Sequence, residues 1–306
     1  MFPLVSIFAP PNYSRAALLS LVVFAWWPLG DAFLKMVGES HVPMGEVFLI
    51  CGLSSMAAIF VTASLCGKRA NLRPRNWRGL VALGSCQIVS FSFWLLALPL
   101  LPLGNAYIFS FLTPMFVACL AVLFLKEPLG WKRALSIGAG FCGVVIAIQP
   151  SSLFQPGGHL LAYLFLFGNM LGSATQMFLL RLVSTKESCE STVFYSRAIL
   201  ASCGLFLCFI NGFVPIEPWA VLAICGSGVI GGLGWSLLAQ AYKFAPASFV
   251  APFQYTQLVW GALVGYLLWK DLPSMSLVLG SAVIILSNLY NVRDERRISR
   301  TMPRVD

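Results

Sequence analysis

The chain contains few charged residues for its length. Only 10% of its 306 residues are charged, whereas 58% are hydrophobic, and the mean hydropathy is +0.84. A soluble globule of this size needs more polar surface than this composition supplies. The composition therefore excludes a soluble domain and predicts an all-α protein embedded in a lipid bilayer.

Several motifs of enzymes and metal sites are also missing. The nine cysteines include no pair at C-x-x-C spacing, the two histidines form no H-E-x-x-H, and no G-x-x-x-x-G-K-[ST] loop occurs. No serine or cysteine has an evident base beside it, which disfavours a membrane enzyme. We expect no catalytic residues, no cofactor and no metal site. A channel or a structural subunit is an alternative that the sequence leaves open.

What the chain does have is a series of long apolar runs. Most are close to the ~20 residues that a helix needs to cross a hydrocarbon layer of ~30 Å. They predict ten transmembrane helices, at about residues 16–37, 43–66, 79–98, 104–125, 132–149, 158–182, 191–213, 219–242, 247–269 and 273–291.

The basic residues are distributed unevenly between the predicted loops. Seventeen of the 20 lie on one side, two, Lys35 and Lys270, lie on the other, and Arg197 lies inside a span. Since cytoplasmic loops carry the excess of Lys and Arg, this predicts both termini in the cytoplasm, and we expect a multi-pass protein of the bacterial inner membrane. The net charge of +9 is spread over loops and a tail, which does not favour nucleic-acid binding.

Residues 97–143 resemble residues 241–287 at a shift of 144. The shift places Phe109 on Phe253 and Lys126-Glu127 on Lys270-Asp271. The first helices of the two halves align more weakly at a shift of 142, where chance is a competing explanation. Halves of five helices must be inverted, so we predict one repeat over 1–150 and an inverted one over 151–306, with a short basic cytoplasmic tail. Such a duplication is typical of secondary transporters that work by alternating access.

Several segments resemble a known family. They are Ala97 to Pro102; Lys126-Glu127-Pro128 with Trp131-Lys132-Arg133; and Gly140-Phe141-Cys142-Gly143-Val144 ending at Pro150. The chain is similar along nearly its whole length to the EamA-type members of the drug/metabolite transporter superfamily, which have ten helices in two inverted halves. Asp31, Lys35 and Glu46-Val47 look most like the branch with S-adenosylmethionine uptake carriers and some riboflavin carriers. One departure is Ile50-Cys51-Gly52, where many members have an arginine.

Charged side chains within apolar spans usually face a cavity or a partner. Asp31 lies about 15 residues into the first span, or roughly 22 Å along its axis. It could form an i,i+4 pair with Lys35, or bind a cationic group or exchange a proton. We expect Arg197 to extend to the cytoplasmic surface or cap neighbouring carbonyls, and Glu46 to lie near the outer surface within reach of water.

The predicted spans are also rich in aromatic and amide side chains, which together suit a flat, partly polar or cationic solute. The family resemblance places a cavity between helices one, three, four, six, eight and nine. It implies these substrate-binding residues: Trp27, Asp31, Gln87, Trp94, Tyr107, Ser110, Gln176, Trp235, Gln254 and Tyr255. Pro114 and Pro252, within the fourth and ninth spans, are expected to act as gating hinges. The glycines of the eighth span fit either close packing or a moving gate.

The resemblance implies a secondary active transporter of a small organic metabolite, with S-adenosylmethionine as the first candidate. Import or export of amino acids, riboflavin or another metabolite is the alternative. The only partners expected are the solute and the lipid bilayer, and monomer and homodimer are both open.

Overall fold

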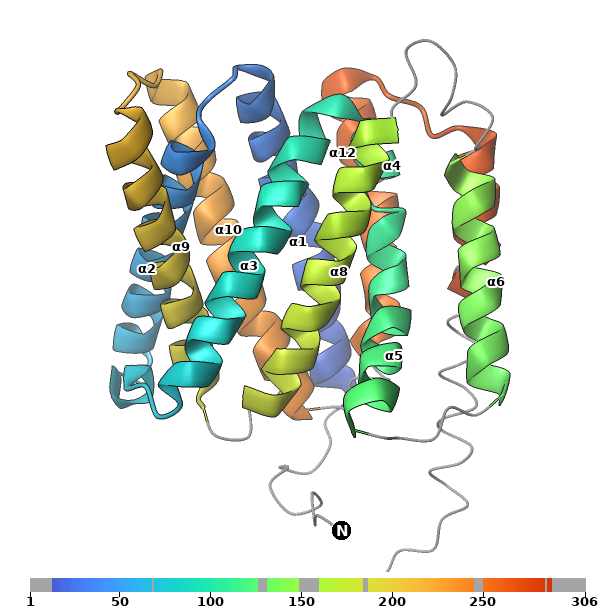
Figure 1. The fold of residues 1–306 in the computed structure, drawn as a ribbon, viewed down its shortest axis with the longest axis horizontal. Helices are drawn as coiled ribbons and strands as arrows, with labels where there is room; N and C mark the ends of the chain where they lie inside the picture. The colour runs from blue at the N-terminus through green and yellow to red at the C-terminus, as the bar shows by residue number, and fades with distance from the viewer. Residues whose placement is uncertain are drawn as a thin grey trace, which may run out of the picture.

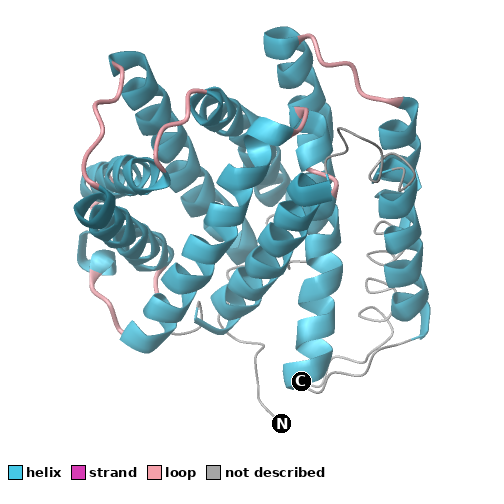
Figure 2. Cartoon of the chain, turned by 45° about the horizontal axis from the view of Figure 1, so that its top comes forward, coloured by secondary structure: helices cyan, strands magenta, loops and turns pink. Residues whose placement is uncertain are grey.

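The computed structural model describes residues 13–67, 69–125, 131–148, 160–183, 187–244, 250–283 and 285–287, and every regular element within them is helical (Figures 1 and 2). The prediction of an all-α protein is therefore confirmed for this part of the chain. The Lys126-Glu127 turn and the basic tail lie outside the described residues.

Six helices of the described chain are long and apolar enough to cross a membrane. They are α1 (Tyr13–Glu39), α2 (Met44–Leu65), α3 (Trp77–Ala97), α8 (Leu160–Val183), α9 (Cys189–Asn211) and α10 (Pro218–Phe244). Their bounds lie within a few residues of predicted spans, because the apolar runs that set those spans end at polar or helix-breaking residues. Asn76 caps α3 by accepting from the Gly79 N–H, and Ser188 caps α9 by accepting from the Ser191 N–H.

The remaining predicted spans are shorter or broken. The third span ends in η2 (Leu98–Leu100), and the fourth comprises α4 (Leu103–Ala106), η3 (Phe109–Leu112) and α5 (Thr113–Leu125). The described part of the ninth comprises η4 (Ala251–Tyr255) and α12 (Thr256–Trp269). The fifth is α6 (Trp131–Ile148), and a shorter apolar helix covers Met275–Ser287, with residue 284 outside the described chain. Ten membrane crossings stay a prediction.

The two prolines lie at the starts of elements rather than inside continuous helices. Pro114 is the second residue of α5, and Pro252 is the second residue of η4. The first turn of a helix tolerates proline because its N–H groups have no intrahelical acceptor. In the fourth span the change from η3 to α5 lies just before Pro114, whereas in the ninth span the change from η4 to α12 lies after Pro252, between Tyr255 and Thr256.

The helices pack in pairs that join the two predicted halves. α1 packs mainly against α10, α3 against α8, and α2 against α9. The first helix of each half thus packs on the third helix of the other, and the two second helices pack on each other. α1 and α10 lie together near the middle of the ribbon in Figure 1.

Glycines in α10 permit part of this packing. A Cβ on Gly228 would stand 2.7 Å from the Cys51 carbonyl oxygen, and one on Gly232 would stand 3.0 Å from the Ser55 Cβ. Ser55 also donates a hydrogen bond to the Gly228 carbonyl at 2.5 Å. These two glycines therefore serve close packing of α10 on α2, whereas a gating role for the α10 glycines stays a prediction.

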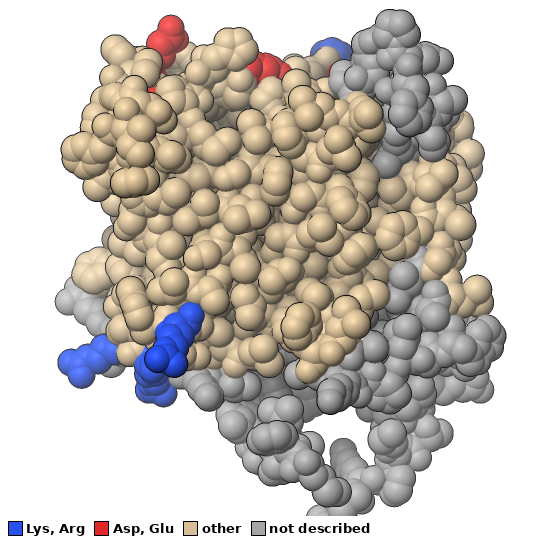
Figure 3. All heavy atoms as spheres, viewed as in Figure 1, with Lys and Arg blue, Asp and Glu red and all other residues tan. Residues whose placement is uncertain are grey.

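Large apolar side chains cover much of the outer surface. Phe209 and Leu222 are each 73% exposed, and Val259 is 66% exposed. Exposed apolar surface of this kind is unfavourable in water but matches lipid tails. In Figure 3, most of the visible blue Lys and Arg side chains lie at the end where α2 ends and α3 begins, whereas the red Asp and Glu side chains lie at the opposite end together with one blue side chain.

Glu46 differs from our expectation that water reaches it. It is only 3% exposed, and its Oε1 accepts a hydrogen bond from the Val214 N–H at 2.6 Å. The reason is that the segment between α9 and α10 covers the start of α2. Glu46 fastens that segment, which is a structural role.

Candidate functional site

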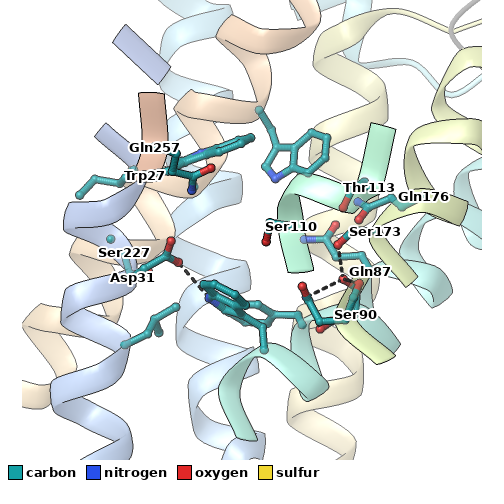
Figure 4. A pocket seen from close by; sticks show the side chains of 18 of the residues that line it. Trp27, Asp31, Gln87, Ser90, Ser110, Thr113, Ser173, Gln176, Ser227 and Gln257 are labelled. Carbon is teal, nitrogen blue, oxygen red and sulfur yellow. Dashed lines mark hydrogen bonds between the residues drawn. The ribbon is translucent and has the colours of Figure 1, made fainter. Parts of the chain in front are cut away.

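A cavity of about 180 Å³ lies among the helices of both halves (Figure 4). Side chains from α1, α3, α8, α9, α10 and the two broken spans line it, with Cys51 of α2. Nine of the ten residues proposed from the sequence take part: Trp27, Asp31, Gln87, Trp94, Tyr107, Ser110, Gln176, Trp235 and Gln254. The tenth, Tyr255, is not among the lining residues; it packs edge-on against Phe111 with ring centroids 5.4 Å apart. That these residues bind a solute stays a prediction.

The Asp31 carboxylate is held by two aromatic donors. The Trp94 Nε1–H donates to Oδ1 at 3.0 Å, and the Tyr107 hydroxyl donates to Oδ2 at 2.6 Å. The two rings lie against each other with centroids 5.6 Å apart. Each carboxylate oxygen can accept a second hydrogen bond. The carboxylate is thus fixed at the cavity wall and retains the capacity to bind a ligand.

Asp31 and Lys35 do not form the i,i+4 ion pair that was one reading of the sequence. Lys35 instead places its Nζ 3.7 Å from Oδ2 of Asp271 and 4.5 Å from the centroid of the Trp269 ring. Both partners lie at the end of α12, which packs against α1. The local spacing permitted a pair, but a tertiary partner and a ring face compete for the ammonium. Asp31 is therefore left to the cavity.

Arg197 is also placed differently from the expectation. It is only 5% exposed and lines the cavity instead of extending to a surface. With its amide oxygen facing the guanidinium, Gln87 accepts from Nη1 at 2.8 Å and from Nε at 3.2 Å. Arg197 lies eight residues after the start of α9, or about 12 Å along the axis, which is a long reach to the surface for its side chain. That depth was the signal in the sequence for a buried role.

Polar contacts join α3 and α8 at the opposite wall, as Figure 4 shows. The Ser90 and Ser173 hydroxyl oxygens lie 2.7 Å apart, and the Asn169 amide donates to the Ser90 carbonyl at 2.9 Å. Ser173 is the residue that aligns with Asp31 in the other half. One wall therefore carries a carboxylate and the other wall neutral hydroxyl and amide groups.

Two indole rings form a further part of the lining. The rings of Trp27 and Trp235 have centroids 5.6 Å apart. A Cβ on Gly234 would stand 2.3 Å from Nε1 of Trp27, so the glycine makes room for this indole. The cavity thus combines ring faces, one carboxylate, one guanidinium and several neutral polar groups, a set that can bind a partly charged, ring-bearing solute.

Comparison with known proteins identifies the family. The model of the EamA-like transporter family matches residues 14–149 and again 160–293. An S-adenosylmethionine uptake transporter of Rickettsia bellii (strain RML369-C) is 30% identical over 206 residues, covering 67% of this chain and 68% of that protein. A riboflavin transporter of Vibrio cholerae serotype O1 is 26% identical over 260 residues, covering 85% and 86%.

A solved crystal structure also has this fold. It matches with a TM-score of 0.67 at 16% identity, covering 93% of this chain and 99% of that one. The two matches of the family model show that the chain belongs to the EamA-like transporter family. It is a membrane transport protein, as the sequence predicted.

Proposed function

We propose that this protein is a secondary active transporter of a small cationic metabolite with an aromatic ring system, and that S-adenosylmethionine is the first solute to test. The observation that carries the proposal is the Asp31 carboxylate, held at the cavity wall by Trp94 and Tyr107. A sulfonium or ammonium group in a low-dielectric cavity needs a counter-charge and gains from nearby ring faces. The similarity to S-adenosylmethionine uptake transporters supports this choice.

Riboflavin is the alternative solute. The similarity to a riboflavin transporter of Vibrio cholerae supports it, and the indoles of Trp27 and Trp235 could stack on a flavin ring. A neutral flavin would depend on the rings much more than on the carboxylate. Binding of S-adenosylmethionine should therefore depend strongly on the Asp31 charge, whereas binding of riboflavin should depend on it little.

For the mechanism we propose alternating access by two inverted halves, residues 1–150 and 151–306. The reciprocal packing of first on third helices supports this, as do contacts between residues 144 positions apart. Gln254 donates to the Ser110 carbonyl at 3.3 Å, and Phe111 contacts Tyr255. Related positions that meet in this way are expected close to a pseudo-two-fold axis, where transporters place their binding sites. A gradient or solute exchange supplies the energy.

The proposed function is tested by uptake into proteoliposomes. A carrier gives saturable, time-dependent uptake of labelled S-adenosylmethionine, and accelerated exchange when unlabelled solute is preloaded inside. A thermal-shift comparison of S-adenosylmethionine, S-adenosylhomocysteine and riboflavin identifies the ligand, since binding stabilises the folded state by mass action. Non-saturating flux without counterflow would identify a channel. Stabilisation by riboflavin alone would favour the alternative solute.

The topology prediction places both termini and the 67–78 loop in the cytoplasm and Asp271 outside. In a variant without native cysteines, a cysteine at position 271 is expected to react with an impermeant maleimide in intact cells, whereas one at position 73 reacts only after permeabilisation. Protection of position 271 in intact cells would contradict the inverted arrangement. Native Cys66 must be removed, because it is exposed at the end of α2.

The gating prediction concerns Pro114 and Pro252, which are the second residues of α5 and η4. If the broken spans bend during transport, Pro114→Ala and Pro252→Ala should slow transport several-fold while changing equilibrium binding less. The comparison requires uptake rates in proteoliposomes and ligand affinities for the same preparations. Equal losses in both would indicate misfolding, and wild-type rates in both variants would remove the hinge.

A further inference from the structure

Arg197 is a buried cation that the proposed recognition of a positively charged group does not explain. It is 5% exposed and lines the cavity, and within the described residues no carboxylate lies in ion-pair distance of it. A guanidinium inside a membrane protein is costly unless a counter-charge or strong acceptors surround it. With the Gln87 amide oxygen turned toward it, the acceptor of the guanidinium is a neutral group.

The local geometry leaves one side of the guanidinium open. Gln87 occupies Nε and one N–H of Nη1, whereas an arginine offers five donors. A Cβ on Gly231 would stand 3.5 Å from Nη2, and Gly231 itself lines the cavity. Because this glycine has no side chain, the Nη2 edge is not covered from that direction. Gln87 fixes the plane of the guanidinium, and the uncovered donors suit a planar anion bound through two parallel hydrogen bonds.

The Arg197 guanidinium and the Asp31 carboxylate face one cavity. Asp31 lines it from α1 and Arg197 from α9. A solute with a single positive charge would satisfy Asp31 and leave Arg197 without an anion. A zwitterion satisfies both charges at once. Since Asp31 is on α1 and Arg197 on α9, such a solute would bridge the two predicted halves.

We propose that Arg197, positioned by Gln87, binds the carboxylate of the solute, so that the site recognises an α-amino acid head group while Asp31 takes a positively charged group. The inference rests on the proposed transport function and narrows its substrate class. S-adenosylmethionine carries both groups together with a ring system, whereas riboflavin has no carboxylate. Arg197 would thus select against flavins and against amines that lack the acid group.

The test compares S-adenosylmethionine with its decarboxylated analogue, which keeps the sulfonium, the amine and the adenosine. Wild-type protein is expected to bind S-adenosylmethionine roughly 10- to 100-fold more tightly, the scale of lost charge-assisted hydrogen bonds. Arg197→Gln should lose this preference and bind both compounds alike. Arg197→Lys keeps the charge but cannot form two parallel hydrogen bonds, so it should retain part of the preference. Gln87→Ala should weaken the preference without abolishing it.

Each outcome bears on a separate statement. Equal affinities of the wild type for the two compounds would overturn the carboxylate site, whether or not the Arg197 variants fold. If Arg197→Gln loses the same affinity for both compounds, Arg197 does not recognise the carboxylate in particular. That result would also overturn the carboxylate site. If no S-adenosyl compound binds the wild type, S-adenosylmethionine is not the solute. The carboxylate site is then tested by comparing the affinities for L-methionine and for 3-methylthiopropylamine, which lacks the carboxylate. Failure of every amino acid to bind would then overturn the inference.

Discussion

Asp31→Asn is expected to weaken the binding of S-adenosylmethionine by about 1–3 kcal/mol, or roughly 5- to 150-fold, as expected for the loss of hydrogen bonds to a charged group. Asparagine keeps the shape of the side chain and removes its charge. It also cannot accept from both Trp94 and Tyr107, because one oxygen becomes an NH₂ donor. The affinity is measured by isothermal titration or by the ligand dependence of the thermal midpoint in detergent.

Lys35→Met is the matched control for this variant. Lys35 lies one turn further along α1, but its ammonium contacts Asp271 and the Trp269 ring. Its loss should therefore change the affinity less than the loss of the Asp31 charge does. Normal binding and transport of S-adenosylmethionine by Asp31→Asn would refute recognition of the cation by this carboxylate. Comparable losses in both variants would indicate a general electrostatic effect.

Much of the helical architecture could be predicted because it depends on local composition. An apolar run long enough to span a bilayer becomes a helix whatever its neighbours are, since every backbone group must be satisfied within the segment. The spans at 43–66 and 219–242 accordingly match α2 and α10 closely. The breaks near Pro114 and Pro252 followed from the chemistry of proline. Their positions did not, since the first-turn placement of each proline depends on the surrounding backbone.

The candidate site was predicted less evenly, because partners are set by packing between helices. Helix spacing allowed Asp31 and Lys35 to pair, but it carries no information that Asp271, 236 positions after Lys35, competes for the ammonium. Tyr255 was included as an aromatic residue of the ninth span, although its ring packs on Phe111. The sequence shows neither which face of η4 meets the cavity nor that the segment is a 3₁₀ helix.

The burial of Arg197 could have been predicted from its position in the sequence. A basic residue in an apolar span can extend to the surface only when the span end lies within reach of its side chain. Its distance from the start of α9 argued against that, while the acceptor at Gln87, 110 residues earlier, was not visible in the sequence. Depth within a span was therefore a usable signal for a buried charge, and the identity of its partner was not.

Gly204→Ala is expected to destabilise the protein by at least about 1–3 kcal/mol, the usual effect of overpacking. The substituted position is where α9 crosses α2. A Cβ there would stand 2.4 Å from the Leu49 nitrogen and 2.6 Å from the Gly45 carbonyl oxygen. These are backbone atoms of a helix, which cannot yield by a change of rotamer, so α2 and α9 would have to separate. The thermal midpoint in detergent and the fraction of monodisperse protein on gel filtration measure the effect.

Gly138→Ala in α6 is the matched control, because among the described residues no atom outside the backbone of its own helix lies within 4 Å of the position of the new Cβ. Alanine lowers the backbone entropy lost on forming a helix, so this variant should be unchanged or more stable by about 0.5–1 kcal/mol. Glycine-to-alanine substitution is thus expected to change stability in opposite directions at these two helical positions, because α2 approaches closely only at Gly204. Equal stability of the two variants would mean that α2 and α9 do not cross at Gly204, and the packing of the two halves through their second helices would have to be abandoned.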